Sequence, residues 1–315
     1  MDAEDIHQSV LLEESLRLLQ PENGGLLVDA TLGMGGHSEG LLDASSKVSV
    51  IGIDQDTEAL EIAKKRLSRF GERISFSQSN FSEIVEVVRD AQQGSPDGII
   101  ADLGVSSLQL DSETRGFSFR FDSPLDMRMD AASGAETVAE MLARIEQEEL
   151  ADIIYRFGEE RASRRIAKWI VEKRTSGTPI ATTFELAELV RRAVRTNPKD
   201  KIHPATRTFQ ALRIAVNGEL DILEKFISDS VDLLKTNGIL AIITFHSLED
   251  RIVKHAFQYL AGRCICPPRI PQCVCGTVKR VEILTRKPIV AGLAEQDKNP
   301  RSRSAKLRAC RKLER

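Results

Sequence analysis

The part of the chain that most constrains its fold is a glycine-rich turn, Asp-Ala-Thr-Leu-Gly-Met-Gly-Gly-His-Ser, at residues 29–38. A short apolar run at 26–28 comes directly before it, and residues 39–44 after it have the composition of a helix. Strand, glycine turn and helix in this order are typical of a nucleotide-binding βα unit, because glycine lets the backbone pass close to a ligand and the helix N-terminus offers N–H groups. A tight turn that binds nothing has the same pattern.

The spacing of the glycines excludes two common phosphate sites. Gly33-x-Gly35-Gly36 differs from the G-x-G-x-x-G of dinucleotide-binding enzymes. A phosphate-binding P-loop would require Lys-Ser or Lys-Thr after the glycines, and neither pair is present.

Three further strand-like runs follow before residue 110, at 48–53, 73–81 and 97–101. Helical spacing of apolar residues separates them, for example over residues 57–70. Four such βα units predict an α/β fold with a doubly wound, parallel sheet. Ligands of open α/β sheets bind outside the carboxyl ends of the strands.

Three residues stand at those predicted strand ends. Asp54 lies about twenty residues after the glycine turn, where an acidic residue accepts hydrogen bonds from ribose hydroxyls. Phe81 ends the third run and is placed to pack on a nucleoside base. Asp102 ends the fourth, where it faces either an amino group of the cofactor or the incoming substrate.

The regular α/β pattern stops after residue 110 and resumes near residue 221. A long loop over 111–130 and helical periodicity from about 138 to 216 lie between. We therefore expect an all-helical subdomain, residues 125–210, inserted into an α/β core formed by residues 1–124 and 211–315. The core would end in a basic tail, residues 297–315, lying on the surface.

Charge is distributed unevenly along the chain. Residues 155–215 hold 14 Lys and Arg against 6 Asp and Glu, and residues 276–315 hold 12 against 4, although the net charge is only −3. Two basic regions indicate a polyanionic partner or, alternatively, solvated helix faces. No apolar run approaches the roughly 20 residues of a membrane span. The acidic N-terminus lacks a secretory signal, so we expect a cytoplasmic location and no membrane partner.

Several long motifs together resemble the RsmH (MraW) family of S-adenosylmethionine-dependent methyltransferases. They occur in the order of the family from residue 7 to residue 308, which makes the resemblance specific. The motifs are His7-Gln-Ser-Val-Leu, residues 29–38, Asp102–Asp111, Arg115–Phe119, Pro124–Asp130, His203–Arg213, Phe245–Arg251 and Asn299–Arg308.

The resemblance implies a class I methyltransferase fold, Rossmann-like, with a mostly parallel sheet and the helical insertion. It also implies S-adenosylmethionine as cofactor, and methylation of the exocyclic N4 of a cytidine in the decoding region of 16S rRNA within the small ribosomal subunit. No obligate protein partner is evident. The matching cofactor-binding positions are Gly35, Gly36, His37, Asp54, Phe81, Asp102 and Gln109.

The sequence leaves two interpretations open for each of three features: Asp102, His246 and a group of phenylalanines. Asp102 would accept a proton from the amine or would only bind the cofactor. His246, after the predicted strand at 239–244, would act in the cleft or, as we favour, cap the following helix. Phe117, Phe119 and Phe121 would stack on bases or form an edge strand.

The residues that contact RNA are predicted in the two basic regions. They are Arg161, Arg164, Arg165 and Lys168 on helical spacing, and Arg301, Arg303, Lys306 and Arg308 in the tail.

Four cysteines form a C-x-C-x6-C-x-C pattern at Cys264, Cys266, Cys273 and Cys275. Four thiolates in twelve residues are able to close a tetrahedral zinc site. The usual ligand spacing is C-x2-C, however, so the sequence favours a metal-free loop packed by its prolines. We accordingly expect no metal ion, and we interpret Cys310 as an ordinary residue of the tail.

Two other functions remain compatible with the sequence. The same chemistry would serve another acceptor, such as a DNA cytosine or a protein amine. Alternatively, the chain would be an RNA-binding assembly factor that keeps the cofactor fold without turnover.

Overall fold

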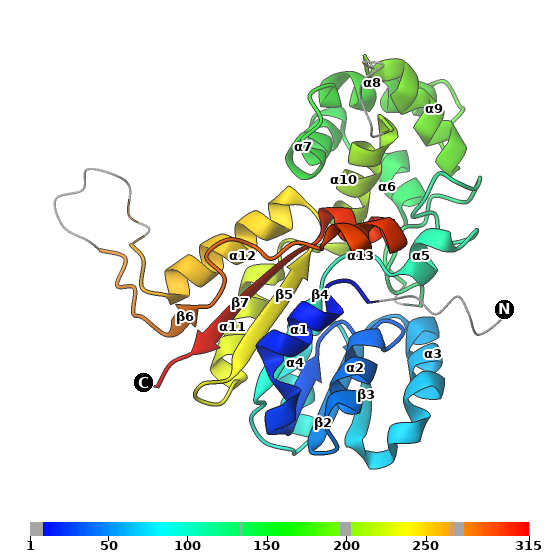
Figure 1. Ribbon diagram of the computed structural model, residues 1–315. Helices are drawn as coiled ribbons and strands as arrows, with labels where there is room; N and C mark the ends of the chain where they lie inside the picture. Colours follow the sequence, from blue (N-terminus) through cyan, green and yellow to red (C-terminus); the bar gives the residue numbers. More distant parts are fainter. Residues whose placement is uncertain (1–8, 133, 196–202, 265, 267–273, 315) are drawn as a thin grey trace. The chain divides into compact units, whose positions relative to one another are not determined.

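The computed structural model describes residues 9–132, 134–195, 203–264, 266 and 274–314. The chain divides into two compact units (Figure 1). Residues Met1–Gly104 and Leu220–Arg315 form the first, which we call the sheet unit. Residues Val105–Glu219 form the second, the helical unit.

Among the described residues, the sheet unit contains a seven-stranded sheet of order β3-β2-β1-β4-β5-β7-β6. β1 to β5 run parallel to one another, whereas β7 is antiparallel to both of its neighbours, β5 and β6. The strands are β1 (Gly25–Asp29), β2 (Val48–Asp54), β3 (Ile74–Gln78), β4 (Gly98–Asp102), β5 (Ile239–Thr244), β6 (Val281–Ile283) and β7 (Lys306–Lys312).

The α-helices of the sheet unit are α1 (Leu12–Leu19), α2 (Gly36–Ala44), α3 (Thr57–Leu67), α4 (Ile84–Asp90), α11 (Leu223–Leu233), α12 (Ser247–Leu260) and α13 (Leu293–Lys298). Its short 3-10 helices are η1 (Pro21–Asn23), η2 (Ser68–Arg73), η3 (Phe81–Glu83) and η4 (Pro300–Ser304).

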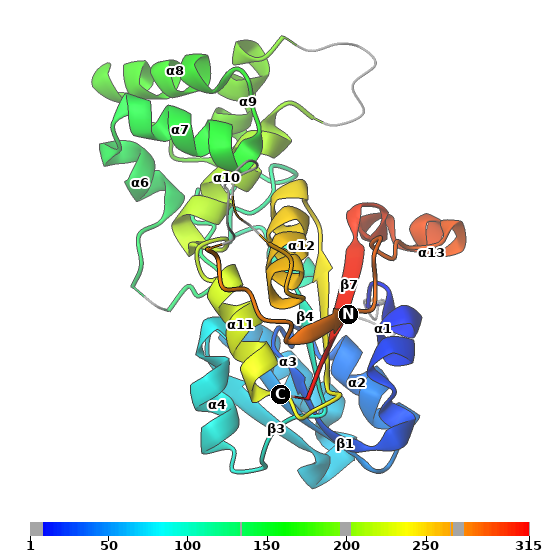
Figure 2. The same cartoon turned by 90° about the vertical axis from the view of Figure 1, so that its left-hand side faces the viewer.

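Helices cover both faces of this sheet. Leu27 and Ile100 point to the face packed by α1, α2 and α3, and their neighbours Val28 and Ile99 point to the face packed by α4, α11 and α12. Figure 2 shows α1 and α2 on one side of the sheet and α4 and α11 on the other. Two covered faces explain why the central strands β1, β4 and β5 carry continuous apolar runs, because side chains that point to either face of such a strand are buried. The predicted doubly wound α/β fold is confirmed.

The prediction that residues 297–315 lie on the surface is wrong for residues 306–312. Residues 306–312 form β7, which pairs with β5 and with β6 inside the sheet. Leu307 and Ala309 are buried on one face and Cys310 on the other. The basic composition of this segment predicted exposed side chains. The Arg308 guanidinium is nevertheless buried, because it pairs with Asp250, with Nε 2.7 Å from Oδ1.

The helical unit consists of α5 (Ser107–Asp111), α6 (Val138–Arg144), α7 (Gln147–Gly158), α8 (Ser163–Thr175), α9 (Thr183–Ala193) and α10 (Ala205–Asn217). Its apolar core includes the loop before α6, through Phe117, Leu125 and Met127. The compact unit is therefore wider than the range 125–210 predicted for the insertion. α7 and α10 lie in close contact, since a Cβ on Gly158 would stand 2.5 Å from the carbonyl oxygen of Arg207. None of the helices in the described ranges combines the length and apolar character that a membrane span requires.

Candidate active site

Three neighbouring parallel strands of the sheet unit each end in an aspartate. β1 ends at Asp29, β2 at Asp54 and β4 at Asp102. Since these strands are adjacent and parallel in the order β2-β1-β4, their carboxyl ends share one edge of the sheet. The fold thus gathers three carboxylates that lie up to 73 positions apart in the sequence.

Asp54 ties the glycine turn to the second strand. Its Oδ2 accepts a hydrogen bond from the N–H of Gly33 at 2.7 Å, and its Oδ1 accepts one from Asp56 at 2.8 Å. Burial raises the pKa of Asp54 to about 6, although these two hydrogen bonds oppose the shift. Each carboxylate oxygen retains a second lone pair, so further donors such as hydroxyls can still bind.

Asp29 is almost completely buried, with 1% of its surface exposed. Its Oδ2 accepts a hydrogen bond from the hydroxyl of Ser38 at 2.8 Å. Burial raises the pKa of Asp29 to about 6. The sequence analysis missed Asp29 as a site residue, although its position at the end of an apolar run, directly before the glycine turn, was a usable signal.

His37 is buried on α2 and is neutral. Its Nε2 lies 3.0 Å from the carbonyl oxygen of Val10, which can only accept, so Nε2 carries the proton. Burial lowers the pKa of His37 to about 4. Nδ1 consequently offers a lone pair, and it faces Oδ2 of Asp102 at 3.9 Å, too far for a hydrogen bond.

Asp102 is held by its backbone, while its carboxyl group is left open to a ligand. Its N–H donates to the hydroxyl oxygen of Thr31 at 2.6 Å. Its Oδ1 is buried and has no hydrogen-bond partner among the described residues. Burial raises the pKa of Asp102 well above its ordinary value, and the negative charges of Asp29 and Glu249 add to the shift. A buried acceptor without a partner is costly, so this atom marks where a donor is expected.

Glu249 is a further acidic residue that the sequence analysis missed. It lies three residues after His246, and together they form the capping box at the start of α12, as the capping interpretation of His246 predicted. Oε2 of Glu249 accepts the N–H of Phe245 at 2.8 Å. The spacing of an N-cap residue and a glutamate three positions later was the available signal.

The glycines of the turn serve different purposes. Gly33 has φ of +52°, and a Cβ there would meet nothing within 4 Å. A Cβ on Gly35 would lie 2.9 Å from Leu67 Cδ1, and one on Gly36 would lie 2.0 Å from Ser9 Oγ. Gly35 and Gly36 are therefore required for packing within the sheet unit, whereas Gly33 borders open space.

The remaining predicted cofactor residues lie in separate surroundings. Phe81 is half-buried at the start of η3, with its ring edge-on to Phe226 at a centroid distance of 5.0 Å. Gln109 belongs to the helical unit, where its side chain completes a capping box with Ser106 on α5.

A basic groove lies between α12 and β6 in the sheet unit. Its cavity measures about 410 Å³. The cationic residues that line it are Lys254, Arg263, Lys279, Arg286 and Arg308. Of these, only Arg308 was predicted to contact RNA, and its guanidinium already pairs with Asp250. The other four cationic residues lie on separate segments, and composition alone did not predict that these segments line one groove.

The basic residues predicted in the helical unit lie at the start of α8. Arg161, Arg164, Arg165 and Lys168 are all exposed, while Ile166 and Ala167 between them are buried. The phenylalanines predicted nearby do not form an edge strand, because no strand is assigned to 117–121 in this described segment. Phe117 is buried, Phe119 packs edge-on against Phe209 at 5.0 Å, and Phe121 is 38% exposed.

Among the described residues, the strand order, the one antiparallel strand and the acidic carboxyl edge of the sheet define the class of protein. They are those of a class I methyltransferase fold. The chain belongs to the MraW methylase family, whose model matches residues 4–313. It is thus a methyltransferase, and its methyl donor is S-adenosylmethionine.

Relatives with closely similar sequences carry the same name. The chain is 50% identical over 309 residues to the "Ribosomal RNA small subunit methyltransferase H" of Trichlorobacter lovleyi, covering 98% of both chains. It is 50% identical over 308 residues to the protein of that name from Clostridium botulinum, covering 98% of this chain and 99% of the other. A solved rRNA methylase from Streptococcus thermophilus aligns over 97% of this chain and 98% of its own, with 12% identity and a TM-score of 0.44.

Proposed function

We propose that this methyltransferase modifies the exocyclic N4 of a cytidine in the decoding region of 16S rRNA, within the small ribosomal subunit. Family membership supports the chemistry, and the names of the relatives, which refer to small-subunit ribosomal RNA, support the substrate. The observation that carries the site assignment is the buried Oδ1 of Asp102, which has no partner among the described residues.

The acidic sheet edge fits the cofactor. S-adenosylmethionine presents a cationic ammonium and sulfonium, ribose hydroxyls and no phosphate. Asp29, Asp54 and Asp102 supply negative charge and hydrogen-bond acceptors at one edge, which suits those groups. In our proposal Asp54 accepts hydrogen bonds from the ribose hydroxyls. Asp102 accepts a hydrogen bond either from the amino group of the cofactor or from the substrate.

The remaining cofactor contacts follow the resemblance to the family. The backbone at Gly35 and Gly36, together with His37, would border the methionyl end, and Phe81 would pack on the adenine. The resemblance also assigns a cofactor contact to Gln109. The neutral state of His37 suits this position, since a cationic imidazole would repel the cofactor.

When bound, S-adenosylmethionine supplies an electrophilic methyl group on its sulfonium. The chain must hold the cytosine amine in line with that methyl group at close approach. The amine is a poor nucleophile because its lone pair is delocalised into the ring. Asp102 Oδ1 accepts a hydrogen bond from the amine, which localises the lone pair, and then takes the proton that the amine loses.

The base must leave its stack to reach a buried carboxyl group. Phosphates on either side of it require cationic partners. The exposed arginines at the start of α8 and the basic groove between α12 and β6 offer such partners. This distribution supports RNA as the substrate.

The experiment compares Asp54→Ala with the unchanged protein. Binding of S-adenosylmethionine is measured by calorimetry, and N4-methylcytidine formed on isolated, unmodified small subunits is measured by mass spectrometry. Asp54→Ala should abolish both. Asp56→Ala is the matched control, because Asp56 caps α3 two residues away and should cost only stability.

Naked DNA and bulk protein serve as competing acceptors in the same assay. Methylation of DNA alone would overturn the substrate assignment. Undiminished N4-methylcytidine in cells that carry only Asp54→Ala would overturn the catalytic assignment and favour an assembly factor without turnover.

A further inference from the structure

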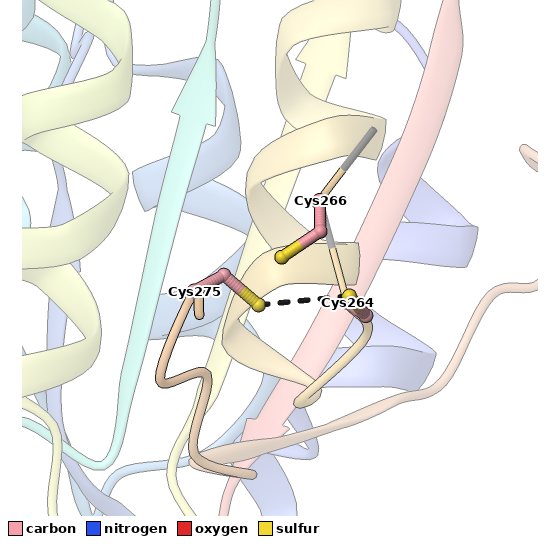
Figure 3. Close-up of side chains that lie close together, drawn as sticks. All are labelled: Cys264, Cys266 and Cys275. Atoms are coloured by element: carbon pink, nitrogen blue, oxygen red, sulfur yellow. Dashed lines mark hydrogen bonds between the residues drawn. The ribbon is translucent and has the colours of Figure 1, made fainter. Parts of the chain in front are cut away.

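The connection between α12 and β6 brings three cysteines together (Figure 3). Sγ atoms of Cys264, Cys266 and Cys275 all lie within 4.8 Å of one another. Those of Cys264 and Cys275 are 3.7 Å apart. Cys273 lies outside the described residues, so the geometry rests on the other three.

These distances suit a shared metal ion better than a disulfide. A disulfide requires two sulfurs at about 2.05 Å. Zinc–sulfur bonds of about 2.3 Å in a tetrahedron place two ligand sulfurs about 3.8 Å apart. The separation of 3.7 Å between Cys264 and Cys275 matches that tetrahedral edge. An ordinary contact of two sulfurs has a similar length, but convergence of a third thiol on the same point is the arrangement of a ligand set.

The backbone holds both ends of this connection in register. Ala261 and Lys279 form an antiparallel bridge, and the N–H of Arg280 donates to the carbonyl oxygen of Leu260 at 2.7 Å. Gly262 permits this approach, since a Cβ there would lie 3.2 Å from Lys279. The backbone thus joins the two ends of the connection on either side of the thiols, which lowers the entropy lost when a ligand binds between them.

The surroundings of the thiols also suit thiolates. The N–H of Val274 points to Sγ of Cys266, with a nitrogen–sulfur distance of 3.4 Å. Backbone donors of this kind orient and stabilise metal-bound ligands. Gly276 has φ of +58°, so the chain turns directly after Cys275.

We propose that Cys264, Cys266 and Cys275 bind one Zn²⁺ as thiolates, and that the ion clamps the connection between α12 and β6. Thiolate ligands select soft or borderline metals, and a tetrahedral site built on sulfur indicates zinc. The clamp would hold Arg263 and Lys279, which flank the cysteines, against the basic groove. The sequence spacing favoured a metal-free loop, and the proposal departs from that expectation because the fold brings the thiols together.

Metal content of the full-length protein tests the proposal directly. The protein is expressed with added zinc, purified under reducing conditions without chelators, and analysed by inductively coupled plasma mass spectrometry. We expect about one zinc per chain, and a loss of at least about fivefold in Cys264→Ser and in Cys275→Ser. Cys310→Ala is the matched control, because Cys310 is buried in β7 and should leave the zinc content unchanged.

Two further measurements guard against variants that fail to fold. Reconstitution of the unchanged protein with Co²⁺ should give the intense visible bands of a tetrahedral thiolate complex. Removal of the metal with a strong chelator should expose the peptide bonds after Arg263 and Lys279 to trypsin, while cleavage elsewhere stays constant. Less than about a tenth of an equivalent of zinc in the unchanged protein, or equal zinc in the cysteine variants, would overturn the proposal.

Discussion

Substituting the buried Asp29 by asparagine should make the cofactor-free protein more stable at alkaline pH. Asparagine has nearly the same shape and can still hydrogen-bond Ser38, whose hydroxyl sits 2.8 Å from Oδ2 of Asp29. The substitution also removes a buried negative charge, because only 1% of the surface of Asp29 is exposed. Asp29 also raises the pKa of Asp54 and of Asp102, so its removal relieves the other carboxylates.

The pH window follows from the shifted pKa. In the folded chain the pKa of Asp29 is about 6, against 3.8 for an unperturbed aspartate. Between these values the folded state binds more protons than the unfolded state, so stability falls as pH rises and then levels off above about pH 6. The shift corresponds to about 3 kcal/mol. Asp29→Asn should therefore match the unchanged protein near pH 4 and gain up to about 3 kcal/mol by pH 8.

The assay must report on the sheet unit. The single tryptophan, Trp169, lies in the helical unit, so its fluorescence would follow the wrong transition. Urea titration with pulsed hydrogen exchange, read by mass spectrometry on peptides that cover β1 and β4, isolates the sheet. Asp90→Asn, at an exposed position, controls for the change in net charge. A gain that is equal at pH 4 and pH 8, or a loss at pH 8, would refute the reasoning.

Three other substitutions test separate parts of the argument. Asp102→Asn should lower kcat at least about a hundredfold while the Kd for S-adenosylmethionine changes less than tenfold; a rise in Kd with unchanged kcat would make Asp102 only a cofactor ligand. Asp250→Leu leaves the Arg308 guanidinium buried without its partner and should cost about 3–5 kcal/mol in urea denaturation; restored stability is expected when Arg308→Leu is added. Arg263→Glu in the basic groove should weaken binding to the small subunit and reduce its salt dependence, measured by filter binding at several salt concentrations; unchanged binding would remove the groove from the RNA interface.

The sequence determined the parallel part of the sheet and the positions of its acidic strand ends. Strand runs that are apolar on both faces, such as 98–101, have few alternatives to a covered parallel sheet, and an aspartate that follows such a run must lie at the carboxyl edge. Asp54 and Asp102 could be placed for that reason. The helix cap at His246 could also be predicted from the sequence, since a capping box involves residues only three positions apart.

Only the tertiary structure decided what depends on distant segments. The burial of β7 depends on β5, a strand far earlier in the chain. Whether Oδ1 of Asp102 has a partner among the described residues likewise depends on distant segments. The three thiols lie within twelve residues, but they converge because the connection between α12 and β6 folds back on itself. Charge alone predicts an exposed side chain for Arg308, because the sequence does not show its buried partner, Asp250. Periodicity reports which face of an element is buried, whereas the pairing of polar groups depends on how the elements pack.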